Sequence, residues 1–328
     1  MSKMFKFKTP QKSFQIGRVK IGGQPGQLPT VLIGTIFYEK HKIVKNPEKG
    51  IFNKKKAEDL IKRQEELSDL TGNPYGVDVV CTSLESARKY IDFVAEVTDA
   101  PISTDIWKPE IRIELLKHVA EVGLSDRIIY NSIMSVPIPK EDEIEAIKES
   151  GVKASILLCY NMEDRTANGV LSLLKGTKEQ KGMLKIAEEA GIEKPLVDAT
   201  IFTYVPSIGV GAKACFMVKD KLGIPVGGSP GNATTMGGPL WKIAKPWGLD
   251  TFKACEAASQ VVPLVLGADF LLYGTIESAP WIFPACAMVD AMLAAAARAE
   301  FGLSTLTKEH SLHKLFPEFV EQLDKTGF

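Results

Sequence analysis

The sequence predicts an α/β protein built as a TIM-type (β/α)8 barrel, and two observations support this prediction. First, a run of four to seven β-forming residues is followed by a longer segment of helical period, and this alternation occurs eight times in 328 residues. Second, no Gly-x-Gly-x-x-Gly motif follows the first run, and no change of composition divides the chain in two. The second observation disfavours the alternative, an open doubly wound sheet.

The expected strands are short and rich in Val, Ile, Phe and Tyr, as buried parallel strands usually are. They span Val31–Phe37, Val77–Cys81, Pro101–Asp105, Arg127–Asn131, Ala154–Tyr160, Pro195–Asp198, Ile224–Gly227 and Phe270–Tyr273. A stretch of alternating character, Phe14–Gly22, precedes them and predicts an N-terminal hairpin.

Helices are expected between the strands and after the last one. They span Lys54–Leu70, Leu84–Val97, Pro109–Val122, Lys140–Glu149, Lys178–Ala190, Ala212–Leu222, Thr251–Leu266 and Pro280–Phe301. Glycines such as Gly123 and Gly302 follow several of them, and glycine ends helices readily because it adopts positive φ at low cost. The amphipathic segment from Ser304 predicts a helical appendage, so the expected division is a single barrel domain with its hairpin over residues 1–303 and an appendage over residues 304–328.

The composition narrows the range of partners. Forty basic residues balance forty acidic ones, so no net field attracts nucleic acid or an anionic membrane. The first residues show no apolar segment of a secretory signal, and a cytoplasmic location is therefore expected. The most apolar late segment, Ala279–Ala297, contains Pro280, Pro284 and Asp290, and we interpret it as a buried helix with no insertion into a membrane.

Cysteine and histidine spacings predict no metal site. The five cysteines form no Cys-x-x-Cys pair, and the four histidines form no His-Glu-x-x-His motif. Reduced, mostly buried thiols in a cytoplasmic protein are expected.

Polar side chains stand where the expected strands end. In a barrel of this kind the carboxyl ends of all the strands surround one mouth, which is where the chemistry takes place. Carboxylates and carboxamides at such a mouth suit hydrogen bonding to the edge of a flat, nitrogen-rich heterocycle. The candidate ligand-binding residues are Asp105, Asn131, Asn161, Asp198, Ser229 and Asn232.

Each candidate also has a structural interpretation. Asp105 or Asp198 could cap the following helix, and Asn131 or Asn161 could form a turn. The glycine-rich loop at residues 227–232 could be a tight turn or a phosphate-binding cradle of backbone N–H groups. Asp78 lies in the middle of a strand and is a weaker candidate.

Several blocks of sequence resemble one family. The segment Val19–Gly26 reads Val-Lys-Ile-Gly-Gly-Gln-Pro-Gly, and it is followed by Pro29–Tyr38; further similar blocks are Gly72–Tyr75, Tyr130–Ile133, Gln180–Met183, Lys194–Asp198 and Asp269–Glu277. Together they resemble the MtrH subunit of tetrahydromethanopterin S-methyltransferase, from about residue 5 to residue 300.

The resemblance implies a homodimeric, pterin-binding methyltransferase barrel. Such a barrel moves a methyl group, by in-line SN2 transfer, between a reduced pterin (tetrahydrofolate or tetrahydromethanopterin) and the cobalt of a corrinoid, a cobalamin-type group carried by a partner protein. In similar methyltetrahydrofolate:corrinoid enzymes, an Asp, an Asn, an Asp and an Asn after the third, fourth, sixth and seventh strands hold the pterin. These positions match Asp105, Asn131, Asp198 and Asn232, and the resemblance makes Asp198 and Asn232 the expected catalytic residues.

Two other functions remain open from the sequence. Cys81 and Cys159 end two expected strands, as a zinc-dependent thiol methyltransferase barrel would require. A non-catalytic subunit that docks a corrinoid protein is the second alternative. Bulky residues at Asp105-Ile-Trp-Lys-Pro depart from the family pattern, which leaves open whether the chain works in a membrane complex or alone. The loops expected to form the docking rim are Phe37–Lys42, Ile106–Lys108, Pro206–Val210 and Thr234–Trp247.

Overall fold

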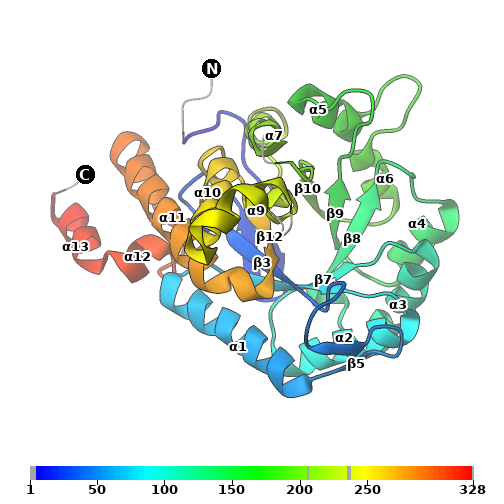
Figure 1. The fold of residues 1–328 in the computed structure, drawn as a ribbon. Helices are drawn as coiled ribbons and strands as arrows, with labels where there is room; N and C mark the ends of the chain where they lie inside the picture. Colours follow the sequence, from blue (N-terminus) through cyan, green and yellow to red (C-terminus); the bar gives the residue numbers. More distant parts are fainter. Residues whose placement is uncertain (1–4, 205–206, 235–237, 327–328) are drawn as a thin grey trace.

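A closed barrel of parallel strands forms the centre of the protein, as the sequence predicts (Figure 1). The computed structural model describes residues 5–204, 207–234 and 238–326. Strand β12 pairs with β3, which closes the barrel. Around it run β3 (Val31–Ile36), β6 (Tyr75–Val80), β7 (Ile102–Asp105), β8 (Ile128–Met134), β9 (Ala154–Leu158), β10 (Lys194–Asp198), β11 (Val226–Gly228) and β12 (Phe270–Thr275).

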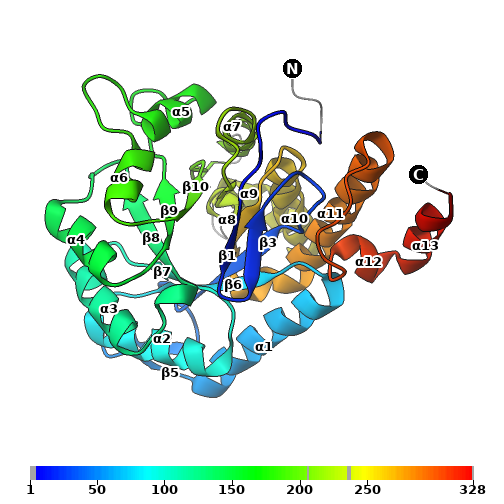
Figure 2. The ribbon, with the colours of Figure 1, turned by 180° about the vertical axis from the view of Figure 1, so that it is seen from behind.

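Helices cover the outside of the barrel (Figures 1 and 2). They are α1 (Lys54–Thr71), α2 (Leu84–Val97), α3 (Pro109–Glu121), α4 (Glu141–Glu149), α5 (Ala167–Lys175), α6 (Met183–Glu189), α7 (Ser207–Leu222), α10 (Leu249–Val265) and α11 (Ala279–Phe301). Two short helices, α8 (Pro230–Thr234) and α9 (Pro239–Ala244), lie between β11 and α10, and 3-10 turns occur at Ser125–Arg127, Lys245–Trp247 and Ile276–Ser278.

One helix assignment from the sequence was wrong. The expected helix Lys178–Ala190 is reduced to α6, because residues before Met183 form a turn in which Gly176 bridges Lys181. The unexpected helix α5 begins after Thr166, whose hydroxyl accepts the Asn168 N–H at 3.3 Å. Its glycine and serine are weak helix formers, which is why its sequence did not predict a helix.

The expected N-terminal hairpin is present as β1 (Ser13–Ile16) and β2 (Val19–Gly22). Its apolar side chains Ile16, Val19 and Ile21 belong to one buried cluster with the barrel residues Val31 and Phe270. A second small hairpin, β4 (Val44–Asn46) and β5 (Ile51–Phe52), follows the first barrel strand and was not predicted. The first hairpin therefore covers the amino-terminal end of the barrel, and the carboxyl ends of the strands remain open.

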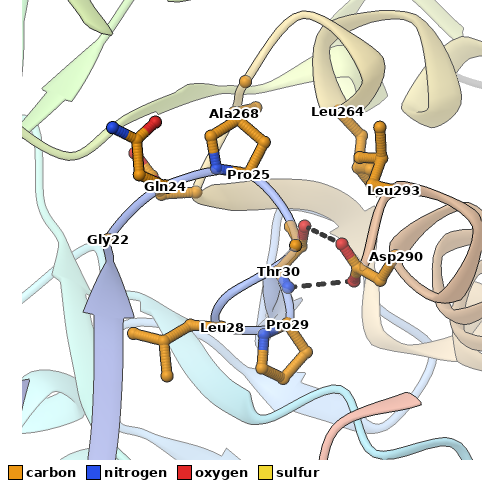
Figure 3. Close-up of a pocket in the computed structure, with 13 residues that line it drawn as sticks. Gly22, Gln24, Pro25, Leu28, Pro29, Thr30, Leu264, Ala268, Asp290 and Leu293 are labelled. Carbon is orange, nitrogen blue, oxygen red and sulfur yellow. Dashed lines mark hydrogen bonds between the residues drawn. The ribbon is translucent and has the colours of Figure 1, made fainter. Parts of the chain in front are cut away.

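A small cavity of about 20 Å³ lies at the covered end, between the loop after β2 and α11 (Figure 3). Beside it, the N–H and Oγ1 of Thr30 donate to Asp290 at 2.9 Å each, and Asn73 Nδ2 donates to Asp290 at 2.6 Å. Burial raises the pKa of Asp290 to about 6. These bonds join the residues just before β3 and β6 to α11, and the cavity has room for about one water molecule.

Helix α11 carries the C-terminal helices α12 (Ser311–Leu315) and α13 (Pro317–Thr326). The expected appendage is therefore helical, while its separation from the barrel at residue 303 stays a prediction. Within the described chain, one segment, Ile276–Phe301, is long and apolar enough to cross a membrane by length and composition. In the most apolar 18-residue stretch of this segment, 56% is buried inside the protein, so the segment packs as a core helix of the barrel.

Candidate active site at the carboxyl ends of the strands

A cavity opens at the carboxyl ends of the barrel strands and encloses about 770 Å³, including the solvent at its mouth. Its wall includes five of the six candidate residues, namely Asp105, Asn131, Asp198, Ser229 and Asn232. Asp105 and Asp198 end β7 and β10, and Ser229 and Asn232 follow β11, whereas Asn131 lies within β8, which continues past the predicted end to Met134. The barrel thus brings together side chains up to 127 residues apart, the separation of Asp105 and Asn232 (232 minus 105). Their convergence depends on parallel strands, which all end on the same side.

Asn161 does not line the cavity. Its Nδ2 donates to the Gly169 carbonyl at 3.3 Å, and its Oδ1 accepts the N–H groups of Glu163 and Asp164 at 3.0 and 2.9 Å. Its amide therefore shapes the connection between β9 and α5. This matches the structural interpretation, a turn, and a role for Asn161 in ligand binding stays a prediction.

Asp198 ends β10 and is almost completely buried, with 3% of its surface exposed. Its Oδ1 accepts the Thr200 N–H at 2.7 Å, and its Oδ2 accepts the Ser229 hydroxyl at 3.2 Å. Burial raises the pKa of Asp198 to about 6, and the two hydrogen bonds limit that rise. The carboxylate is therefore ready to accept hydrogen bonds from a ligand near neutral pH.

Asp78, the weaker candidate from the sequence, lies in the wall next to Asn131. It accepts hydrogen bonds from Ser103 Oγ at 2.6 Å, Thr35 Oγ1 at 3.0 Å and Asn131 Nδ2 at 3.3 Å. Burial raises the pKa of Asp78, and these three donors oppose the rise. Because Asn131 Nδ2 also donates to Ser103 Oγ at 3.2 Å, the network fixes the orientation of the Asn131 amide.

Asp105 ends β7 at the mouth of the cavity, and its side chain is more exposed than that of Asp198. The surrounding wall nevertheless displaces water from the carboxylate, which is the main reason that the pKa of Asp105 rises to about 7. The nearby charge of Asp78 raises it further, whereas the Arg112 guanidinium lowers it. Asp105 thus changes its charge close to neutral pH.

Arg112 is a site residue that the sequence did not indicate. It is 3% exposed and lines the cavity, although it belongs to α3. Its Nη2 donates to Glu143 on α4 at 2.6 Å, its Nη1 donates to the Ile106 carbonyl at 3.1 Å, and Tyr130 also donates to Glu143. Arg112 and Glu143 are 31 residues apart in different helices, so no local pattern announces the pair.

The glycine-rich loop after β11 connects a strand to a short helix. Strand β11 ends at Gly228 and α8 begins at Pro230, so the loop between them is tight, and a phosphate-binding role for its N–H groups stays a prediction. It places Ser229 against Asp198 and Asn232 at the mouth, where Asn232 Nδ2 donates to the Ile201 carbonyl at 3.4 Å.

Two rim loops include positions that the structure does not describe. Residues 206 and 235–237, in the expected docking segments at residues 206–210 and 234–247, lie outside the described residues. Of the tryptophans on the rim, Trp107 and Trp247 are 74% and 78% exposed. Trp241 instead packs edge-on against Phe252 at 5.3 Å between ring centroids.

The cysteines do not form the thiolate set of a zinc enzyme. Cys81 Sγ and Cys159 Sγ are buried and donate weakly to the carbonyls of Val79 and Leu157, at 3.8 and 3.5 Å. Burial raises the pKa of both thiols well above its usual value. Across residues 5–204, 207–234 and 238–326, no group of three His, Cys, Asp or Glu side chains is arranged to hold a metal ion.

A parallel barrel whose polar cavity lies at the carboxyl ends of its strands is a typical enzyme architecture. Among solved structures, the dihydropteroate synthase of Xanthomonas albilineans in complex with indole-2-carboxylic acid and 6-chloroguanine shares this fold. The TM-score is 0.57 at 15% identity, covering 87% of this chain and 98% of that one. A similarity at this identity concerns the fold alone.

Residues 9–305 match the family described as tetrahydromethanopterin S-methyltransferase MtrH subunit. The corresponding subunit from Methanopyrus kandleri is 42% identical over 311 residues, covering 92% of this chain and 96% of that protein. The one from Methanothermobacter thermautotrophicus is 41% identical over 95% of this chain and is itself covered in full. The equivalent subunit of a putative methyltransferase, mtx, from Methanosarcina barkeri is 40% identical with the same coverage. The chain belongs to this family and is a methyltransferase, which confirms the resemblance.

Proposed function

We propose that this chain transfers a methyl group between a reduced pterin and the cobalt of a corrinoid carried by a partner protein. The pterin is tetrahydromethanopterin, named for the similar subunits, or tetrahydrofolate. The observation that supports this proposal best is the shared cavity wall, in which Asp105 and Asp198 face one cavity together with the Asn131 amide. Two carboxylates at the wall match a ring that presents several N–H groups along one edge.

In this proposal two carboxylates bind the pterin ring and one amide orients it. Asp105 and Asp198 accept hydrogen bonds from the ring N–H and amino groups, and they do so best when ionised. Asn131 is held in one orientation by Asp78 and Ser103, so it presents a fixed face to the ring. Ser229 holds Asp198 in place.

The chemical step exchanges one bond for another at the methyl carbon. The carbon–nitrogen bond of the methylpterin breaks while a carbon–cobalt bond forms with an electron pair from the metal. The pterin nitrogen keeps its bonding pair, and it leaves readily only if it receives a proton or a strong hydrogen bond. Asn232 stands at the exposed mouth, where its amide can assist this nitrogen, and Asp198 fixes the ring in line.

The open rim provides a surface for the corrinoid protein. The methyl group must lie shallow enough for cobalt on another protein to reach it, and exposed aromatic side chains are common anchors at protein interfaces. Trp107, which also lines the cavity, and Trp247, which lies outside its wall, are exposed aromatic side chains of this kind. We place the reaction in the cytoplasm.

We also propose a homodimer that forms through α10 and α11. The outward face of α10 presents Val262 and Val265, and that of α11 presents Met288 and Met292. The two helices lie side by side, and the views from the two sides agree (Figures 1 and 2). On each helix the two exposed apolar side chains are three or four residues apart and therefore lie on one side of that helix, and exposed apolar side chains of this kind are what an interaction surface requires.

Binding of a methylated reduced pterin tests the proposal. The unaltered protein should bind it and pass the methyl group to a cobalt-containing corrinoid protein, and Asp198→Ala should weaken binding by about ten- to a hundredfold, because a charge-assisted hydrogen bond is lost. Asp99→Ala is the matched control, since the Asp99 side chain is 86% exposed and lies outside the cavity wall. No pterin affinity in the unaltered protein would favour the non-catalytic docking subunit, and activity that disappears on chelation and returns with zinc would favour the thiol methyltransferase.

A further inference from the structure

Thr200 has an unusual backbone conformation beside the cavity. It follows Asp198 by two residues and has a φ of +51°, in the left-handed region that β-branched residues rarely adopt. Its N–H donates to Asp198 Oδ1 at 2.7 Å, and this short bond holds the turn. Strained residues of this kind persist where the surrounding structure fixes them, often at ligand sites.

The hydroxyl of Thr200 is available for a ligand. Thr200 lines the cavity, yet its Oγ1 is shielded from solvent and has no hydrogen-bond partner among the described residues. The hydroxyls of Thr35 and Ser229, in the same wall, donate to Asp78 and Asp198. Because a buried hydroxyl without a partner is costly, such a group usually bonds to an ordered water molecule or to a ligand, and here the cavity beside it can supply either.

The position of this hydroxyl beside Asp198 indicates what it meets. A carboxylate that anchors a pterin accepts from the amino group and from the ring N–H next to it. In the pterin ring, the atom after that N–H carries a carbonyl oxygen, which needs a donor. The Thr200 hydroxyl is a donor next to the Asp198 carboxylate, with its backbone N–H bonded to that carboxylate.

We propose that the Thr200 hydroxyl donates a hydrogen bond to the ring carbonyl of the pterin whose amino edge lies on Asp198. This inference rests on the proposed function and adds a specificity-determining residue to it. Asp198 recognises the donors of the pterin edge, and Thr200 recognises the acceptor beside them. The pair therefore reads the donor–acceptor pattern that distinguishes a pterin from a ring without the carbonyl.

The proposed hydrogen bond between Thr200 and the pterin carbonyl is tested by changing each partner in turn, first the protein and then the ligand. The probes are 6-methyltetrahydropterin and its analogue with a thiocarbonyl in place of the carbonyl, which keeps the ring N–H but has a weaker acceptor. Thr200→Val removes the hydroxyl and keeps the shape and branching of the side chain, and Thr200→Ser keeps the hydroxyl. Affinities are measured anaerobically by calorimetric titration of the full-length protein, and thermal unfolding checks that each variant is folded.

We expect Thr200→Val to bind the carbonyl pterin about tenfold more weakly, while Thr200→Ser retains most of the affinity. The change to thiocarbonyl should cost the unaltered protein more affinity than it costs Thr200→Val, because the size of sulfur affects both proteins equally and cancels in the comparison. An equal loss in both proteins, or no loss in the unaltered protein, would overturn the inference. If the unaltered protein binds no reduced pterin, the proposed function itself fails.

Discussion

Gly231 and Gly274 pack backbone against backbone beside the cavity. A Cβ atom on Gly231 would lie 2.7 Å from the Gly274 Cα and 2.9 Å from its nitrogen, closer than real Cβ atoms approach other atoms. This contact seats α8 on β12, and Asn232 is the next residue along α8. The position of the proposed catalytic amide therefore depends on a glycine that has no contact with the ligand itself.

Gly231→Ala should misplace Asn232 and slow methyl transfer. The added methyl group meets backbone atoms, so α8 must move away from β12, and small displacements of a positioned group can cost about a hundredfold in rate. Single-turnover transfer from methylpterin to a corrinoid protein measures this effect. Gly209→Ala on α7 is the control, because a Cβ there meets nothing within 4 Å. Since Gly209 lies in an expected docking segment, both variants are compared at saturating corrinoid protein. Equal rates in the two variants would show that the glycine contact does not position Asn232.

The sequence predicted the barrel well because each of its signals was local. Strand runs such as Ala154–Leu158 and glycine stops such as Gly302 are set by residues that are close together in the chain. The strand-end rule placed Asp105, Asn131 and Asp198 at one mouth because parallel strands share a direction.

The missed residues depend on contacts that are distant in sequence or on backbone conformation. Arg112 reaches the cavity wall through its pair with Glu143 on another helix, and no spacing reveals such a pair. Thr200 matters because of its positive φ and its shielded hydroxyl, which depend on the folded turn after Asp198. One local signal in the sequence could have indicated Thr200. It follows an Asp at a strand end by two residues, and an Asp side chain often accepts the N–H of the residue two positions later.

Trp247→Ala should weaken docking of the corrinoid protein without changing pterin affinity. Trp247 is 78% exposed on the rim and is absent from the cavity wall, and removal of an aromatic anchor commonly costs about tenfold or more in affinity. The apparent KM for the corrinoid protein and the Kd for the methylpterin, measured separately, test this. Trp241→Ala is the comparison, because Trp241 packs on Phe252 and its loss should act on local stability. A fall in pterin affinity with Trp247→Ala would place this side chain in the binding pocket.

Met288→Glu combined with Met292→Glu should convert the proposed dimer into monomers. These side chains are 47% and 62% exposed on one face of α11, and a two-fold interface would bring four added charges into an apolar contact. Sedimentation velocity measures the oligomeric state. Val122→Glu, at the end of α3 and 45% exposed, is the control for adding a charge to an exposed apolar position elsewhere. A wild-type monomer, or an unchanged dimer in the double variant, would contradict the assignment of this face.

Pterin affinity should rise with pH, because the carboxylates that hold the ring must be ionised. The pKa of Asp198 is raised to about 6 and that of Asp105 to about 7, so both are largely protonated at about pH 5 and largely ionised at about pH 8. For each carboxyl group, pterin affinity should fall about tenfold for every pH unit below the pKa of that group, because the ionised fraction falls by this factor. Asp105→Asn, which cannot ionise, should bind more weakly at about pH 8 and should lose the part of the pH dependence near pH 7.

The stability of the ligand-free protein should respond to pH in the opposite sense. Because both pKa values are higher in the folded state than in the unfolded chain, the folded state binds more protons between about pH 4 and pH 7, and these groups lower the free energy of unfolding as the pH rises. Relative to the unaltered protein, Asp105→Asn should therefore become more stable as the pH rises through about 7. Denaturant titrations of both proteins across this range measure the difference. A difference in unfolding free energy that does not change with pH would show that Asp105 titrates in the folded protein as it does in the unfolded chain, and pterin affinity would then have to be controlled by Asp198 alone.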